Sequence, residues 1–297
     1  MKRYFALSRT THGILDLATP GFCAVLWLGA FPEWPILLLS ICTAFAAYTA
    51  TYALNDLVGI AGDREKFAGG INAGYSVEAS DLRYPLAQDV LSHRNGFIWF
   101  GVWFALALIG SYLLNPVIVL ILVAASLLEI LYCRLFKVTY LRTLVSGLVK
   151  SSGPIAAVFV VDHQPSPWLL LLVFAWVFFW EIGGQNVPAD WNDTVEDRRV
   201  NAKTIPLLFG PYKAGLVVVG ALTLTVIASL FLPLVSPAAL GLPYVLASAL
   251  VGSILLLLPA FRLLQIQGPR QAGRLFDNAS YYPLAQLAII ALFVLVR

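Results

Sequence analysis

Long apolar stretches recur along the chain and are separated by short or polar connections. A helix needs about 20 mostly apolar residues to cross a lipid bilayer. Several neighbouring stretches are joined by only a few residues rich in proline and asparagine, which predicts tight hairpins. Nine segments are long enough to be transmembrane helices, at residues 14–31, 35–54, 97–114, 116–136, 141–161, 167–184, 211–232, 242–264 and 279–296.

The composition supports this pattern. Of the 297 residues, 60% are apolar and 12% are charged, whereas about a quarter of a typical soluble domain is charged. A soluble chain of this length has too little polar surface to cover so many apolar side chains. The sequence therefore predicts an all-α integral membrane protein. It excludes a soluble nucleic-acid-binding protein, a disordered scaffold and a disulfide-stabilised secreted domain.

The positive charges predict how the chain is oriented. With the N-terminus in the cytoplasm, all 19 lysines and arginines except Lys150 and Arg297 fall on the cytoplasmic side, as the positive-inside rule requires. The C-terminus is then outside, and both long polar stretches, after the second and sixth segments, are cytoplasmic. We expect the cell (inner) membrane to be the location.

Acidic residues are concentrated in those two polar stretches, 55–64 and 189–198. The two stretches match when they are superimposed, which predicts an internal duplication of the kind seen in many membrane proteins. We expect one transmembrane domain over 1–297, with repeat halves of about 1–140 and 141–297. The superposition makes three pairs: Asp56 with Asp190, Gly59 with Asp193, and Asp63 with Asp197.

The spacing of these acids predicts that they converge. Positions i, i+3, i+4 and i+7 of a helix share a face, so the acids of each stretch point the same way. Carboxylates that converge need a cation between them, and Mg²⁺ prefers oxygen ligands and completes its shell with substrate phosphates. Two opposed clusters therefore favour a diphosphate bound through Mg²⁺. The predicted metal ligands are Asn55, Asp56, Asp63, Asp190, Asp193 and Asp197, and the five aspartates are also the predicted catalytic residues.

Basic and phenolic side chains near the two clusters are candidates for binding the diphosphate. For most of them the alternative is an anchor at the cytoplasmic interface. Lys150 differs, because a lysine inside a membrane segment needs a polar partner. The candidates are Arg64, Tyr132, Arg134, Lys137, Lys150, Arg198 and Lys203.

At these residues the sequence resembles the UbiA superfamily of intramembrane prenyltransferases. That family has an aspartate-rich motif N-D-x-x-D-x-x-x-D after its second helix and D-x-x-D-x-x-x-D after its sixth. The second motif is complete here, whereas Gly59 replaces the central aspartate of the first. The resemblance spans nearly the whole chain. It extends to three further stretches, Arg83–Leu86, Tyr132–Lys137 and Lys203–Pro206.

The resemblance implies nine helices around a central cavity, with both aspartate-rich helix ends on the cytoplasmic side. It implies Mg²⁺-dependent transfer of a prenyl group from a polyprenyl diphosphate to a small lipophilic or aromatic acceptor, such as a quinone-type precursor, among membrane lipids. Within the family, the altered first motif leaves a terpene cyclase as an alternative. A secondary transporter is the alternative from another class, because repeats and intramembrane charges also occur there.

Overall fold

Helices make up nearly all of the regular structure. The computed structural model describes residues 2–68 and 84–296, and these residues contain no strand. Within them, eight helical runs are long and apolar enough to cross a membrane. The predicted all-α membrane fold is therefore confirmed. Of the stretches that carry the family resemblance, Arg83 lies outside the described residues.

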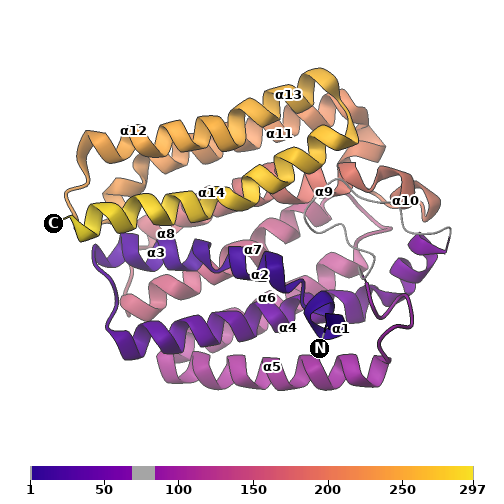
Figure 1. Ribbon diagram of the computed structural model, residues 1–297, viewed down its shortest axis with the longest axis horizontal. Helices are drawn as coiled ribbons and strands as arrows, with labels where there is room; N and C mark the ends of the chain where they lie inside the picture. The colour runs from indigo at the N-terminus through magenta and orange to yellow at the C-terminus, as the bar shows by residue number, and fades with distance from the viewer. Residues whose placement is uncertain (1, 69–83, 297) are drawn as a thin grey trace.

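The elements follow one another along the bundle in Figure 1, where α9 and α10 lie at one end and the C-terminus at the other. In chain order they are α1 (Lys2–Leu7), α2 (Thr10–Asp16), α3 (Ala18–Leu28), α4 (Trp34–Phe67), α5 (His93–Leu114), α6 (Pro116–Arg134), α7 (Arg142–Val161), α8 (Pro167–Trp180), the π-helix η1 (Glu181–Asn186), α9 (Val187–Asn192), α10 (Thr194–Arg199), α11 (Ile205–Phe231), the 3₁₀ turn η2 (Leu232–Val235), α12 (Gly241–Gly252), the π-helix η3 (Ser253–Leu257), α13 (Leu258–Ile266) and α14 (Pro269–Leu295).

The first predicted span, 14–31, is formed by two shorter helices, α2 and α3, which are separated at Leu17. Pro20 has no N–H to donate to the carbonyl oxygen of Asp16, so the helical hydrogen-bond ladder is interrupted here. Neither short helix is among the eight runs long enough to span by itself. The break brings Asp16 to the border between α2 and α3.

The second predicted span is longer than its apolar segment. α4 continues to Phe67, so the first acidic stretch lies on the last turns of a helix and not in a loop. The predicted hairpin between 97–114 and 116–136 is present. Asn115 caps the N-terminus of α6, because its side-chain oxygen accepts a hydrogen bond of 3.0 Å from the backbone N–H of Val117. Pro116 fits the first helical position.

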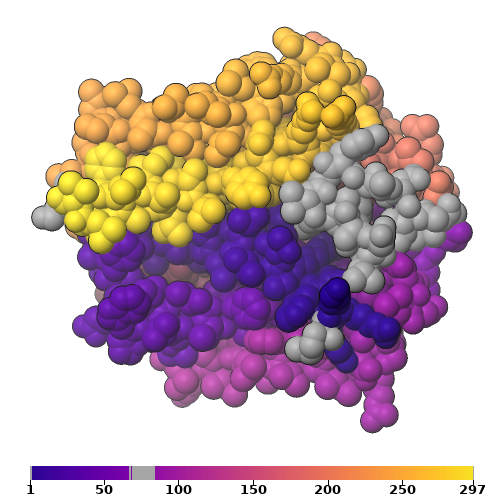
Figure 2. Space-filling model, viewed as in Figure 1, coloured from indigo at the N-terminus to yellow at the C-terminus, as the bar shows by residue number. Residues whose placement is uncertain are grey.

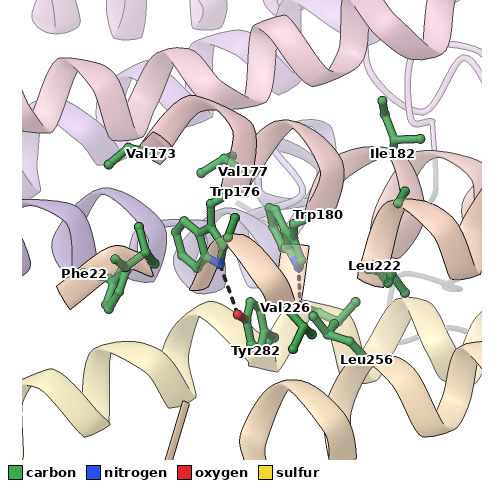
Figure 3. Close-up of a cluster of buried hydrophobic side chains, with 14 of the residues drawn as sticks. Phe22, Val173, Trp176, Val177, Trp180, Ile182, Leu222, Val226, Leu256 and Tyr282 are labelled. Atoms are coloured by element: carbon green, nitrogen blue, oxygen red, sulfur yellow. Dashed lines mark hydrogen bonds between the residues drawn. The ribbon is translucent and has the colours of Figure 1, made fainter. Parts of the chain in front are cut away.

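The largest buried cluster packs α8 against α3, α11 and α14. Trp176 and Trp180 project from α8 into this cluster, and each indole N–H finds an acceptor (Figure 3). Trp176 Nε1 donates to Tyr282 Oη at 3.0 Å, and Trp180 Nε1 donates to the carbonyl oxygen of Ala279 at 2.9 Å. These bonds fix α8 and α14 together, because a buried indole N–H is costly without a partner. The η1 segment, which leads to the second acidic motif, follows α8 directly and packs against α11 and α14.

Candidate active site

Two adjoining cavities lie in the bundle beside this core. The larger, of about 590 Å³, lies among α2, α3, α4, α6 and α7, and we call it the membrane cavity. The smaller, of about 320 Å³, lies where α4 and α9 carry the two acidic motifs, and we call it the polar chamber. Their linings share five residues, which mark the junction between them: Arg9, Asn55, Tyr132, Ala189 and Phe276.

The membrane cavity is lined mainly by apolar side chains. It reaches from the junction to residues of α3 and α4 near the other end of the bundle, such as Val25 and Leu37. Figure 2 shows the surface hollowed between α3 and α4, with deeper residues visible behind them. A long hydrocarbon chain suits such a cavity, because the burial of its apolar surface against apolar walls is favourable.

The first motif presents one face of α4 to the polar chamber. Asn55, Gly59, Asp63 and Lys66 all line it, at the spacing of successive helical turns. Asp56 does not line either cavity. Its side chain is 2% exposed and lies 3.4 Å from the guanidinium of Arg9. Asp56 therefore contacts Arg9, which lines both cavities and also bonds to Asn55, but does not itself line the polar chamber.

Gly59 lies within regular helix and has no positive φ. A side chain is therefore compatible with its backbone. A Cβ added there would lie 3.1 Å from Asp63 Oδ2, which is the only side chain of the described residues within 4 Å. Gly59 leaves open space beside Asp63 at the point where the family motif has a carboxylate.

The second motif departs from the single helical face that its spacing predicts. Asp190 and Asp193 line the polar chamber, but Asp197 does not. The helix is interrupted at Asp193, whose φ of −95° and ψ of 12° end α9 before α10 begins. Asp197 is therefore turned into the protein, with its side chain 1% exposed. Burial raises the pKa of Asp197 to about 7, although the nearby ammonium of Lys66 opposes this shift.

The carboxylates of the second motif have cationic partners within the protein. Lys66 Nζ lies 2.9 Å from Asp193 Oδ2 and 2.8 Å from Asp197 Oδ1. Arg142 Nη1 lies 3.3 Å from Asp190 Oδ1. This corrects the expectation that only a metal balances these charges. Neither Lys66 nor Arg142 is among the predicted site residues, although Lys66 lies on the helical face of α4 that carries Asn55.

The predicted diphosphate-binding residues divide into two groups. Tyr132, Arg134 and Lys137 line the polar chamber. Lys137 Nζ also pairs with Glu65 at 2.5 Å, and the hydroxyl of Tyr132 contacts the guanidinium of Arg142. The others lie elsewhere: Arg64 pairs with the exposed Asp89, Lys150 lines only the membrane cavity, and neither Arg198 nor Lys203 lines either cavity.

The polar chamber fits a divalent cation that keeps water and phosphate ligands. Among the described residues no group of three or more acidic, histidine or cysteine side chains is close enough to hold a metal ion. However, the buried oxygen Asp190 Oδ2 has no hydrogen-bond partner in that part of the chain. Mg²⁺ commonly binds through one or two carboxylates together with substrate oxygens. Asp190 and Asp193, opposite Asn55 and Asp63, form a donor set of this kind.

Comparison with known proteins decides the family. The model of the UbiA prenyltransferase family matches residues 17–290. The chain belongs to this family. This confirms the predicted family and the predicted class of enzyme, a membrane prenyltransferase. No curated protein matches the chain.

Solved structures of UbiA homologues share the fold along almost the whole chain. A homologue from Aeropyrum pernix K1 has a TM-score of 0.70 at 19% identity, and covers 96% of this chain and 98% of its own. A homologue from Archaeoglobus fulgidus, bound to DMAPP and Mg²⁺, has a TM-score of 0.69 at 16% identity, with coverage of 97% and 99%. A digeranylgeranylglyceryl phosphate synthase has a TM-score of 0.69 at 17% identity, with coverage of 100% and 99%.

Proposed function

We propose that this UbiA-family enzyme transfers a prenyl group from a polyprenyl diphosphate to a small lipophilic or aromatic acceptor, in a reaction that depends on Mg²⁺. The observation that carries the proposal is the junction of two unlike cavities. The polar chamber suits a diphosphate, and the membrane cavity suits the hydrocarbon chain attached to it. The A. fulgidus homologues bound to DMAPP or GPP together with Mg²⁺ support this donor class.

The junction is the place where the first carbon of the prenyl chain would lie. In the reaction the bond between this carbon and the diphosphate oxygen breaks, and its electron pair leaves with the diphosphate. A bond to the acceptor then forms, and the acceptor loses a proton. Tyr132 lines the junction, and the face of its ring would stabilise the allylic cation. The apolar walls of the membrane cavity would keep water from this cation.

The residues of the polar chamber would bind the diphosphate leaving group in two ways, through Mg²⁺ and by direct contact. Asp190 and Asp193, with Asn55 and Asp63 opposite, would hold Mg²⁺, whose charge would stabilise the departing diphosphate. Arg142 and the chamber-lining Arg134 and Lys137 would contact phosphate oxygens directly, as arginine and lysine commonly do. Asp56 and Asp197, which lie behind this surface, would act by positioning Arg9 and Lys66. We also propose that the chamber faces the cytoplasm, since the basic residues are concentrated at this side.

Product formation in detergent tests the proposal. Purified protein is incubated with radiolabelled geranyl diphosphate, Mg²⁺ and a set of phenolic acceptors, with no ion gradient. We expect labelled adducts in the wild type and their loss in Asp193→Asn and in EDTA. Asp162→Asn is the matched control, because Asp162 bonds to Trp27 Nε1 at 2.9 Å and lines neither cavity.

The same assay separates the alternatives. An acceptor-independent cyclic hydrocarbon would identify a terpene cyclase and contradict the transfer reaction. Retention of full activity in Asp193→Asn would remove the second motif from the mechanism.

A further inference from the structure

Polar side chains gather on one wall of the membrane cavity, away from the polar chamber. Ser146 and Lys150 on α7 and Glu181 at the start of η1 all line the cavity. Ser146 and Lys150 are four residues apart and so share a helical face. Lys150 is eight residues from Arg142 on α7, which places it about 12 Å farther along the helix axis than the polar chamber.

Glu181 carries the clearest sign of a ligand. Its side chain is only 6% exposed, and Ser146 Oγ donates a hydrogen bond of 2.6 Å to its Oε1. Its second oxygen, Oε2, is buried and has no hydrogen-bond partner in residues 2–68 and 84–296. A buried carboxylate oxygen without a partner is costly. Ser146 therefore holds Glu181 in the cavity wall with one acceptor oxygen left over.

Lys150 supplies hydrogen-bond donors on the same wall. Its Nζ lies 2.7 Å from Asp16 Oδ2, which also accepts a hydrogen bond of 2.5 Å from Tyr52 Oη. A structural link between α2 and α7 accounts for the Asp16–Lys150 pair but not for Glu181. A hydrocarbon chain does not satisfy Glu181 Oε2, because it carries no polar atoms.

We propose that Glu181, Ser146 and Lys150 form the binding subsite for the polar groups of the prenyl acceptor. The subsite fits an aromatic ring with two oxygen substituents, a hydroxyl that donates to Glu181 Oε2 and a second oxygen that accepts from Lys150 Nζ. This inference rests on the proposed transfer reaction. The ring would lie between the subsite and the junction, with its reacting atom about 3–3.5 Å from the donor carbon, as a near-attack geometry requires.

Binding of defined phenols tests this subsite without catalysis. Equilibrium dialysis compares radiolabelled hydroquinone with its monomethyl and dimethyl ethers, using wild type, Glu181→Gln and the double variant Asp16→Asn/Lys150→Met, which removes the ion pair as a unit. We expect the wild type to bind hydroquinone at least about tenfold more tightly than the dimethyl ether, as for a hydrogen bond to a charged group. Both variants should lose most of this preference. Asp162→Asn, the matched carboxylate control outside the cavities, should keep it.

Binding of geranyl diphosphate with Mg²⁺ is measured on the same samples. We expect the wild type to bind it, and retained binding by a variant shows that the variant is folded. If Glu181→Gln does not fold, Ser146→Ala replaces it and should weaken the hydroquinone preference by releasing Glu181. Equal wild-type affinity for the three compounds, or an unchanged preference in the folded variant, overturns the subsite. If the wild type does not bind geranyl diphosphate, the proposed function itself is overturned.

Discussion

Lys66 Nζ lies 2.9 Å from Asp193 Oδ2, and this ion pair joins α4, just after the first acidic motif, to the centre of the second motif. Both side chains line the polar chamber, and that of Lys66 is 7% exposed. The same ammonium lies 2.8 Å from Asp197 Oδ1. A divalent cation that binds Asp193 must therefore share this carboxylate with Lys66 or displace the lysine from it.

Lys66→Met should lower stability and raise the affinity for Mg²⁺. The substitution leaves two carboxylates without their ammonium, and breaking a buried pair costs about 3–5 kcal/mol. It also removes the cation that competes with Mg²⁺ for Asp193. Thermal unfolding in EDTA and in a Mg²⁺ series measures both effects. Arg64→Met is the control, because the Arg64–Asp89 pair is largely exposed, and exposed pairs contribute about 1 kcal/mol or less.

Unchanged stability of Lys66→Met in EDTA would show that the ammonium does not support these carboxylates. A lower Mg²⁺ affinity would show that Lys66 and Mg²⁺ do not compete.

Gly59→Asp should reduce the Mg²⁺ concentration needed for half-maximal activity. The helical backbone at Gly59 accepts a side chain, and the new carboxylate would lie beside Asp63 in the polar chamber. Carboxylate oxygens are the ligands that Mg²⁺ prefers, and mutual repulsion with Asp63 would strengthen the demand for a cation. Gly59→Ala is the control for volume alone and should leave the Mg²⁺ midpoint unchanged. An equal midpoint in the two variants would exclude Gly59 as the place of a missing ligand.

Arg142→Lys should weaken the binding of geranyl diphosphate about tenfold or more, the range for hydrogen bonds to charged groups. The guanidinium lies 3.3 Å from Asp190 and stacks 4.2 Å from the centre of the Tyr132 ring. A lysine cannot reproduce this planar fork or the stacking. Dialysis with labelled geranyl diphosphate measures the affinity, and the exposed Arg199→Lys serves as control. Equal affinities in the two variants would contradict direct contact with the diphosphate.

Much of the fold follows from the sequence, because hydropathy and helix length are local properties. The predicted spans coincide with the eight long helical runs, and the exception, 14–31, is broken by Pro20. The end of α4 was harder to predict. The apolar pattern stops near residue 54, but the helix continues to Phe67, since its last turns are held by packing against other elements.

The site was predictable only as far as helical periodicity holds. Asn55 and Asp63 share a face of α4, as predicted, whereas the break at Asp193 removes Asp197 from the chamber surface. The partners Lys66 and Arg142 depend on contacts between helices distant in sequence. The positive-inside pattern treats all lysines and arginines alike. It therefore could not distinguish Lys66 and Arg142 from basic residues that only anchor a helix at the interface.

Asp56 and Asp63 should respond differently to the same substitution, although the sequence motif predicts both as metal ligands. Asp63 lines the polar chamber, so Asp63→Asn should lower the affinity for Mg²⁺ and geranyl diphosphate together. Asp56 is buried beside Arg9 and lines neither cavity. Asp56→Asn should therefore lower the free energy of unfolding by about 1–3 kcal/mol, the cost of weakening a buried charge-assisted contact.

Isothermal titration with Mg²⁺, with geranyl diphosphate present, and urea unfolding of the same two variants separate these effects. We expect Asp63→Asn to bind Mg²⁺ more weakly with near wild-type stability. We expect Asp56→Asn to be less stable with near wild-type Mg²⁺ binding. Arg9→Met should resemble Asp56→Asn in stability, because it removes the other member of the pair. If Asp56→Asn instead abolishes Mg²⁺ binding without loss of stability, Asp56 is itself a metal ligand and not a partner of Arg9 alone.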